Sequence, residues 1–274
     1  LTSVLINIVL PCVVLDSFLS EEGSEFSSYL PEIVLQLGII YLITILLTAL
    51  IIRKKSPDSP SEKISIIYSN AGFLGIPLLD ALYGPLGRFC AVMAMIAFNV
   101  FFWSYGAMLM AGEDGERAGL KDTMKKILTP PLIAVIFSLL LSAFSLRLPS
   151  IIMEPVASIA AMNSPFAMIV TGVTLADSDL SRLFSKRVIL DSIHKNVTVP
   201  AVLAVIFLLL GFTDDIGISM LTTAACPTAA LVPMLAIQYK KDPQLPSGIF
   251  AFSTILSVLT LPAYIYLIHG LAGV

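Results

Sequence analysis

Long apolar segments, separated by short polar loops, follow one another along almost the whole chain. Most are about 20 residues long, the length that an α-helix needs to cross the hydrocarbon core of a bilayer. The pattern predicts about nine membrane-spanning helices. These predicted spans cover residues 1–20, 31–52, 62–83, 86–110, 127–146, 150–176, 187–211, 214–238 and 247–271. We therefore expect an all-α integral membrane protein with almost no soluble portion.

The composition agrees with a chain embedded in lipid. Of 274 residues, 57% are hydrophobic and only 13% are charged, and the mean hydropathy is +0.93. A soluble domain carries about 25% charged residues. The three cysteines lie in apolar segments without metal-ligand spacing, and two histidines are too few for an intramembrane metalloenzyme. We expect no enzymatic activity, no cofactor, no metal and no nucleic-acid partner.

Basic residues are distributed unevenly between the loops. Thirteen of the sixteen lysines and arginines fall in alternate loops, namely Arg53, Lys54, Lys55 and Lys63, Arg117, Lys121, Lys125 and Lys126, Arg182, Lys186 and Arg187, and Lys240 and Lys241. Cytoplasmic loops are enriched in lysine and arginine. This side is therefore predicted to be cytoplasmic, which places the acidic loop after residue 20 and the C-terminus outside the cell.

Two predicted spans look like copies of one helix interrupted by prolines. Residues Tyr68–Tyr83 and Ala224–Tyr239 lie 156 positions apart, and Pro77 of the first matches Pro233 of the second. The preceding spans also match, because Ile6–Asp16 resembles Ala160–Val170 at an offset of 154. Interrupted helices at corresponding places in two halves indicate the binding site of a secondary transporter.

The spacing of the repeat predicts its orientation. An offset of about 155 residues covers five predicted spans, and an odd number of spans turns the second copy upside down. We therefore expect an inverted repeat of five helices, in which the two interrupted helices cross. The span 127–146 has no counterpart ahead of Leu1, so we expect a parent protein of ten spans whose first helix is missing here.

The interruptions themselves predict an anion site. Asn70 is suited to cap a half-helix that starts at Ala71, and Pro227 is suited to the first position of the other half-helix. Two facing helix N-termini would offer N–H groups and partial positive charge to a carboxylate. The substrate-binding candidates are Ser69, Asn70, Ala71, Asn99, Cys226, Pro227 and Thr228. The alternative is a pair of kinked helices without a site.

Charged residues also occur inside the span that follows Arg187. Asp191 and Lys195 are four positions apart, so they would share a helix face and can pair, and His194 lies between them. Charges inside a span are costly and usually face a cavity or a partner. We expect these three residues to act in substrate or proton coupling, and the alternative is an ion pair near the inner surface.

At these residues the chain resembles the auxin efflux carrier family, which includes the plant PIN-type carriers, and within it a prokaryotic-type member. The stretches that carry the resemblance are Asn70–Gly84, Ala225–Pro227 with Val232–Pro233, Ser253–Pro262, and Lys195 followed by Pro200. Plant carriers have proline where this chain has Ser69, which implies a milder first break.

The resemblance implies a fold, a mechanism and a location in the plasma (inner) membrane. It implies elevator-type alternating access, a homodimer formed through the scaffold, and two domains in each chain. By this resemblance the scaffold domain comprises residues 1–20 and 127–176, and the transport domain comprises residues 31–110 and 187–271, with crossover helices 62–83 and 214–238.

Together these features favour a secondary transporter of small organic anions such as carboxylates. One alternative is a carrier of another substrate, coupled to sodium or protons, in a fold like that of the bile-acid transporters. A further alternative is a membrane sensor or structural protein that has lost transport.

Overall fold

The computed structural model describes residues 1–20, 26–53, 56–112, 124, 126–144, 146, 148–176 and 185–272. These residues are almost entirely helical, with π-helical or 3-10 turns (η) between α-helices, which confirms the predicted all-α architecture. The first half contains α1 (Thr2–Val4), η1 (Leu5–Val9), α2 (Leu10–Leu19), η2 (Ser27–Tyr29), α4 (Leu30–Ile51), α5 (Ser59–Ile67), η3 (Ala71–Gly75), α6 (Ile76–Phe101), η4 (Phe102–Gly106) and α7 (Ala107–Ala111). The second half contains α9 (Pro130–Ala143), α10 (Ser150–Ala160), α11 (Asn163–Ala176), α12 (Lys186–Ile193), η6 (His194–Thr198), α13 (Val199–Leu210), α14 (Asp215–Ala225), α15 (Leu231–Gln238) and α16 (Gln244–Ala272).

The outer surface of the molecule suits lipid. Six helical segments among the described residues are long and apolar enough to cross a membrane, and Pro130–Leu141 is a shorter apolar helix. Large apolar side chains stand exposed on the surface, among them Leu209, Val258 and Tyr266 at 71–81%. So large an apolar surface is unfavourable in water and stable against lipid. The protein is therefore a multi-pass membrane protein.

The longest apolar segment bends in its middle. Within α6, Gly84 has a φ of 59° and Pro85 follows it. A positive φ costs little only for glycine, and proline cannot donate a hydrogen bond to the preceding turn. The bend separates the predicted spans 62–83 and 86–110.

The predicted spans 62–83 and 214–238 are each interrupted by extended backbone. The first stops at the end of α5 and resumes at η3, and the second stops at the end of α14 and resumes at α15. The two extended linkers pair with each other through an antiparallel bridge between Ser69 and Thr228. The amide of Asn70 donates to the carbonyl of Pro227 at 2.8 Å, and the amide of Ala229 donates to the carbonyl of Tyr68 at 2.9 Å.

Two details of the predicted breaks are wrong. Pro227 is not the first residue of a half-helix, because it lies in the extended linker and α15 begins at Leu231. The residue before a proline disfavours helical backbone, and Cys226 accordingly adopts φ −56°, ψ 149° and ends α14. The half-helix after Asn70 does begin at Ala71, but the Asn70 side chain makes no capping hydrogen bond. The backbone carbonyl of Asn70 instead accepts from the amides of Leu74 and Gly75.

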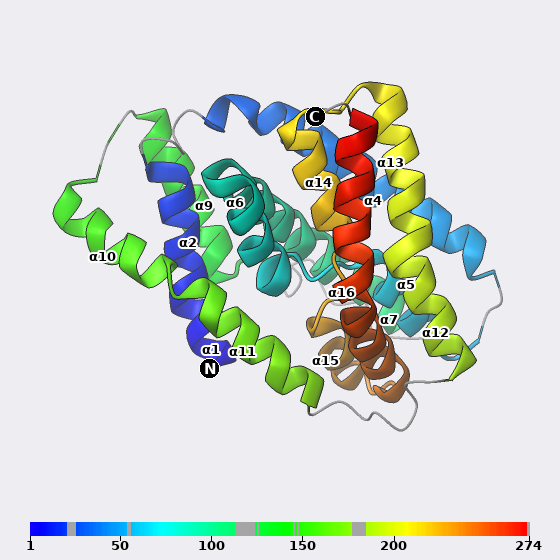
Figure 1. Cartoon of the computed structure of the whole chain (residues 1–274). Helices are drawn as coiled ribbons and strands as arrows, with labels where there is room; N and C mark the ends of the chain where they lie inside the picture. Colours follow the sequence, from blue (N-terminus) through cyan, green and yellow to red (C-terminus); the bar gives the residue numbers. More distant parts are fainter. Residues whose placement is uncertain are drawn as a thin grey trace.

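The helices form two groups (Figure 1). In the α2 group, α2 packs against α9 and α10, and α11 lies against η1. The α6 group comprises α4 to α7 and α12 to α16, in which α14 packs against α6 and α12 packs against α16. The two groups meet where α2 and α11 contact α6 and where α11 contacts η3.

Side-chain contacts join several of the predicted cytoplasmic loops at one end of the molecule. Arg187 forms an ion pair with Asp58 at 2.7 Å, and the ammonium group of Lys126 lies 5.7 Å from the ring centroid of Tyr239. A different contact joins the C-terminal end of α2 to α6, where Arg88 of α6 pairs with Asp16 of α2 at 3.0 Å. We call this the closed end.

Candidate functional site

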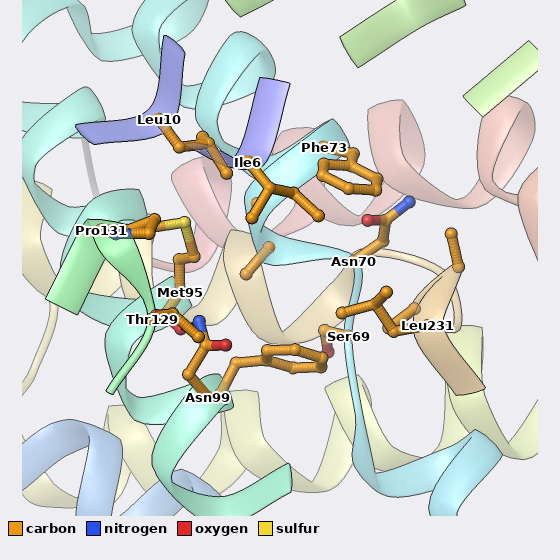
Figure 2. A pocket seen from close by; sticks show the side chains of 15 residues that line it. Ile6, Leu10, Ser69, Asn70, Phe73, Met95, Asn99, Thr129, Pro131 and Leu231 are labelled. Carbon is orange, nitrogen blue, oxygen red and sulfur yellow. The ribbon is translucent and has the colours of Figure 1, made fainter. Parts of the chain in front are cut away.

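A cavity of about 60 Å³ lies where the two helix groups meet, next to the paired linkers (Figure 2). The α6 group contributes most of its wall, and η1, α2 and the start of α9 contribute the rest. The lining residues are Ile6, Leu10, Ser69, Asn70, Ala71, Gly72, Phe73, Met95, Phe98, Asn99, Thr129, Pro131, Ala229, Ala230 and Leu231. Figure 2 shows Asn99 and Thr129 on one side of the cavity and Asn70 and Leu231 on the other.

Some polar atoms of this wall have no partner. The Nδ2 atom of Asn70 and the Oγ1 atom of Thr129 are buried without a hydrogen-bond partner in the described part of the chain. Asn99 donates from Nδ2 to the carbonyl of Met95 at 2.9 Å. An unpaired buried donor or acceptor costs about 1–3 kcal/mol. A ligand with oxygen acceptors would remove this cost at Asn70.

The start of a half-helix lies at the same place. The half-helix that begins at Ala71 lines the cavity with its first turn. The first amide groups of a helix have no partner within the helix, and they carry the positive end of the helix dipole. The wall therefore combines hydrogen-bond donors with positive potential, and no charged side chain lies in the lining given above.

The structure brings only part of the predicted site together. Ser69, Asn70, Ala71 and Asn99 line the cavity, whereas Cys226, Pro227 and Thr228 do not. In their place, Ala229, Ala230 and Leu231 form the wall. The displacement by three residues follows from the late start of α15.

Thr228 and Ser69 instead hold the two breaks together. Thr228 Oγ1 donates to the carbonyl of Ser65 at 2.8 Å, near the end of α5. In the reciprocal contact, Ser69 Oγ donates to the carbonyl of Ala224 at 2.9 Å, near the end of α14. Cys226 is completely buried beside these contacts. Each linker thus satisfies a carbonyl at the end of the other helix.

Lys195 reaches the same junction from η6. Its side chain is 1% exposed, and its Nζ donates to Ser69 Oγ at 2.6 Å and to the carbonyl of Ala224 at 3.4 Å. The predicted ion pair with Asp191 does not form: among the described residues, Lys195 has no carboxylate within salt-bridge distance. The Lys195 side chain extends to the paired breaks instead of back along its helix toward Asp191.

Asp191 and His194 lie elsewhere. Asp191 is buried near Glu62 and Arg187, and Arg187 Nε pairs with Glu62 at 3.0 Å. His194 Nδ1 is 3.2 Å from the hydroxyl of Thr198 on its own helix. The three coupling candidates therefore occupy three different environments.

Sequence reasoning missed Thr129. It stands directly before Pro130 and Pro131, at the start of a predicted span. A hydroxyl that precedes two prolines at the start of a helix was a usable signal, since prolines leave the preceding backbone outside the helix. The described residues contain no group of three or more histidines, cysteines or acids that could hold a metal ion.

Comparison with known proteins agrees with the membrane-spanning architecture. The model of the family described as membrane transport protein, the auxin efflux carrier family, matches residues 1–120 and 117–265. The chain belongs to this membrane transport protein family. Its resemblance to that family, expected from the motifs around Asn70 and Pro227, is thereby confirmed.

A relative in the membrane transport protein family comes from an archaeon. An uncharacterized transporter of Methanothermobacter thermautotrophicus is 26% identical over 273 residues, which cover 96% of this chain and 87% of the relative. The match thus extends over both helix groups and both interrupted helices. Membership in a transporter family makes the cavity at the paired linkers the leading candidate for a substrate site.

Proposed function

We propose that the protein is a secondary transporter of small organic anions, such as mono- and dicarboxylates. The observation that carries this proposal is the buried amide of Asn70, which has no hydrogen-bond partner in the described part of the chain. It lines a cavity beside the start of a half-helix, where two interrupted helices pair. An unpaired donor at the positive end of a helix suits a carboxylate oxygen.

Lys195 adds to the preference for an anion. Its ammonium group lies directly behind Ser69, which lines the cavity, and it has no carboxylate partner among the described residues. A cation in a medium of low dielectric raises the potential over several ångströms. A carboxylate in the cavity would experience this potential.

The position of the cavity supports alternating access. Residues of the predicted cytoplasmic half, such as Ile6, Thr129 and Leu231, line part of the cavity. On the other side of the paired linkers, Phe18 packs on Phe89 with ring centroids 4.7 Å apart. In this proposal, the conformation of the structure is the one open to the cytoplasm and closed to the outside.

The two helix groups then take the roles that the resemblance implies. The α2 group corresponds to the scaffold domain and the α6 group to a transport domain that moves past it as an elevator. The reciprocal contacts of Ser69 and Thr228 support an inverted repeat with crossed broken helices. In this proposal the scaffold also forms a homodimer, and the C-terminus is external.

The proposal is tested with purified protein in proteoliposomes. A panel of acetate, lactate, succinate and malate is assayed for electrogenic flux, with and without pH and sodium gradients. Asn70→Ala removes a hydrogen bond to a charged group, which is worth about 1.5–3 kcal/mol, so flux falls about ten- to a hundredfold. Asn70→Asp abolishes flux, because it places a negative charge against the substrate.

The matched control is Asn7→Ala, since Asn7 is exposed and donates only within its own helix, to Ser3. This variant keeps wild-type flux. Carboxylate flux that is equal in Asn70→Ala, Asn70→Asp and the wild type would refute the site.

A further inference from the structure

Lys195 occupies a position that a free cation would otherwise favour. The helices α5 and α14 both end at the paired linkers. The last carbonyl groups of a helix lack partners within the helix and carry the negative end of its dipole. The carbonyl of Ala224 is one of these groups, and Lys195 Nζ lies 3.4 Å from it. In transporters with broken helices, such helix ends and unwound carbonyls coordinate the coupling cation.

The surroundings of the ammonium group are those of a cation site. The Ser69 hydroxyl accepts from Nζ at 2.6 Å and donates onward to Ala224, so the oxygens of both breaks converge on the charge. A second cavity of about 20 Å³ lies beside Ser69, Thr223 and Ala224. It has room for about one water molecule or a small ion.

We propose that the Lys195 ammonium replaces a coupling cation as a tethered substitute, so that the carrier works without sodium. This inference deepens the proposed function and rests on it for the transport step. The bound charge stabilises the paired breaks in every state of the carrier, because the side chain is covalently part of η6. A free ion would have to bind and leave in each transport cycle, whereas the ammonium group of Lys195 remains in place.

The inference predicts that removal of the side chain opens a site for an added cation. Thermal unfolding of the purified protein is measured in choline chloride, sodium chloride and methylammonium chloride at equal ionic strength. The wild type unfolds at the same temperature in all three salts. Lys195→Ala is less stable in choline, and sodium or methylammonium raises its Tm by about 5 °C, since a ligand that binds only the folded state stabilises it.

Two variants serve as controls. Lys186→Ala removes an exposed lysine from the same span and responds to none of the salts. Lys195→Ala combined with Ser69→Ala loses one ligand of the vacated site, and its response to sodium falls at least severalfold. If Lys195→Ala cannot be purified in choline, it is purified in sodium chloride and then exchanged into choline.

The outcomes separate this inference from the proposed function, because unfolding requires no substrate. A wild type whose Tm or carboxylate flux depends on sodium overturns the inference and leaves the anion site at Asn70 intact. A Lys195→Ala protein that ignores both cations, or that unfolds in every salt, also overturns it. A cation-dependent Lys195→Ala protein that transports none of the carboxylates supports the inference and contradicts the proposed function.

Discussion

At the scale of single residues, two hydroxyl groups explain how both helices can break inside a membrane. A broken helix leaves carbonyl groups without partners, and lipid offers none. Ser69 and Thr228 supply them in a reciprocal arrangement, each bonding to a carbonyl of the other interrupted helix. Ser253 adds support from α16, because its hydroxyl accepts from the amide of Thr228 at 3.2 Å.

Thr228→Val tests this arrangement while it keeps the shape of the side chain. The substitution removes the hydrogen bond to Ser65 and leaves that buried carbonyl unpaired, which costs about 1–3 kcal/mol. We expect the Tm of the purified protein to fall by several degrees. Thr254→Val is the control, since Thr254 bonds to Phe250 on its own helix and its loss costs less. Equal Tm values for the two variants would contradict a structural role for Thr228.

The first break was predictable from the sequence and the second was predictable only in part. Asn70 before a glycine-rich segment marks the start of a half-helix, and the structure begins one at Ala71. Nothing local distinguishes Ala229 and Ala230 from helix, since alanine is the best helix former. The helix nevertheless begins only at Leu231, because the amide of Ala229 pairs with the carbonyl of Tyr68, about 160 positions away in sequence.

At the scale of elements, π-helical turns lie around the site. The described residues contain η1, η3, η4 and η6 as turns of this type. Ile6 of η1 and the first residues of η3 line the cavity, and Lys195 lies in η6. Such turns are rare in proteins as a whole, but those that occur are often found at functional sites. The periodicity of the sequence cannot reveal a π-helical turn, because the extra residue in the turn is held by contacts with residues far away in sequence. The contact of Lys195 with Ser69 is an example.

Loss of the ion pair between α2 and α6 at the closed end is predicted to shift the equilibrium between the proposed inward-open and outward-open states. Arg88 pairs with Asp16 of α2 at 3.0 Å and lies 3.8 Å from Asp80 of its own helix. A partly exposed ion pair is worth about 1 kcal/mol, so Arg88→Ala populates the outward-open state about fivefold more. Cys90, buried next to Arg88, reports this state through labelling by a membrane-impermeant maleimide added from outside.

The labelling experiment uses protein in which alanine replaces the other two cysteines, Cys12 and Cys226. Arg53→Ala is the control, because Arg53 is exposed at the predicted cytoplasmic end and donates to the carbonyl of Leu50 on its own helix. This variant labels at the wild-type rate. If Arg88→Ala labels no faster than Arg53→Ala, the ion pair does not hold the closed end.

At the scale of the whole molecule, the proposed transport depends on the division into two helix groups, because the cavity lies between them. Hydropathy alone predicted the kind of element, because lipid imposes both length and apolarity on each span. It predicted nine spans, whereas six helical segments of the described residues are long and apolar enough to cross a membrane. The grouping came from the family resemblance and not from hydropathy, since every span is apolar enough to pack against any other. In the structure, the cavity draws on both groups: Leu10 and Pro131 come from one, and Asn70 and Met95 from the other.

The proposed movement between the groups predicts that a crosslink across their boundary stops transport. Phe18 of α2 and Phe89 of α6 lie across it, with ring centroids 4.7 Å apart. Phe18→Cys with Phe89→Cys, in protein without other cysteines, forms a disulfide that holds the two Cα atoms within about 7 Å. An elevator displacement would exceed this distance, so oxidation lowers carboxylate flux at least tenfold and reduction restores it.

A second pair within the α6 group controls for the chemistry of the crosslink. Tyr41 of α4 and Phe101 of α6 stack with ring centroids 4.2 Å apart. Tyr41→Cys with Phe101→Cys forms its disulfide inside the α6 group, which moves as one body in the proposed mechanism, so oxidation leaves the flux of this variant unchanged. Loss of maleimide-reactive thiols verifies that both disulfides have formed. If both crosslinked proteins transport at the rate of their reduced forms, α2 and α6 keep their contact throughout the cycle, and the boundary of the moving body lies elsewhere.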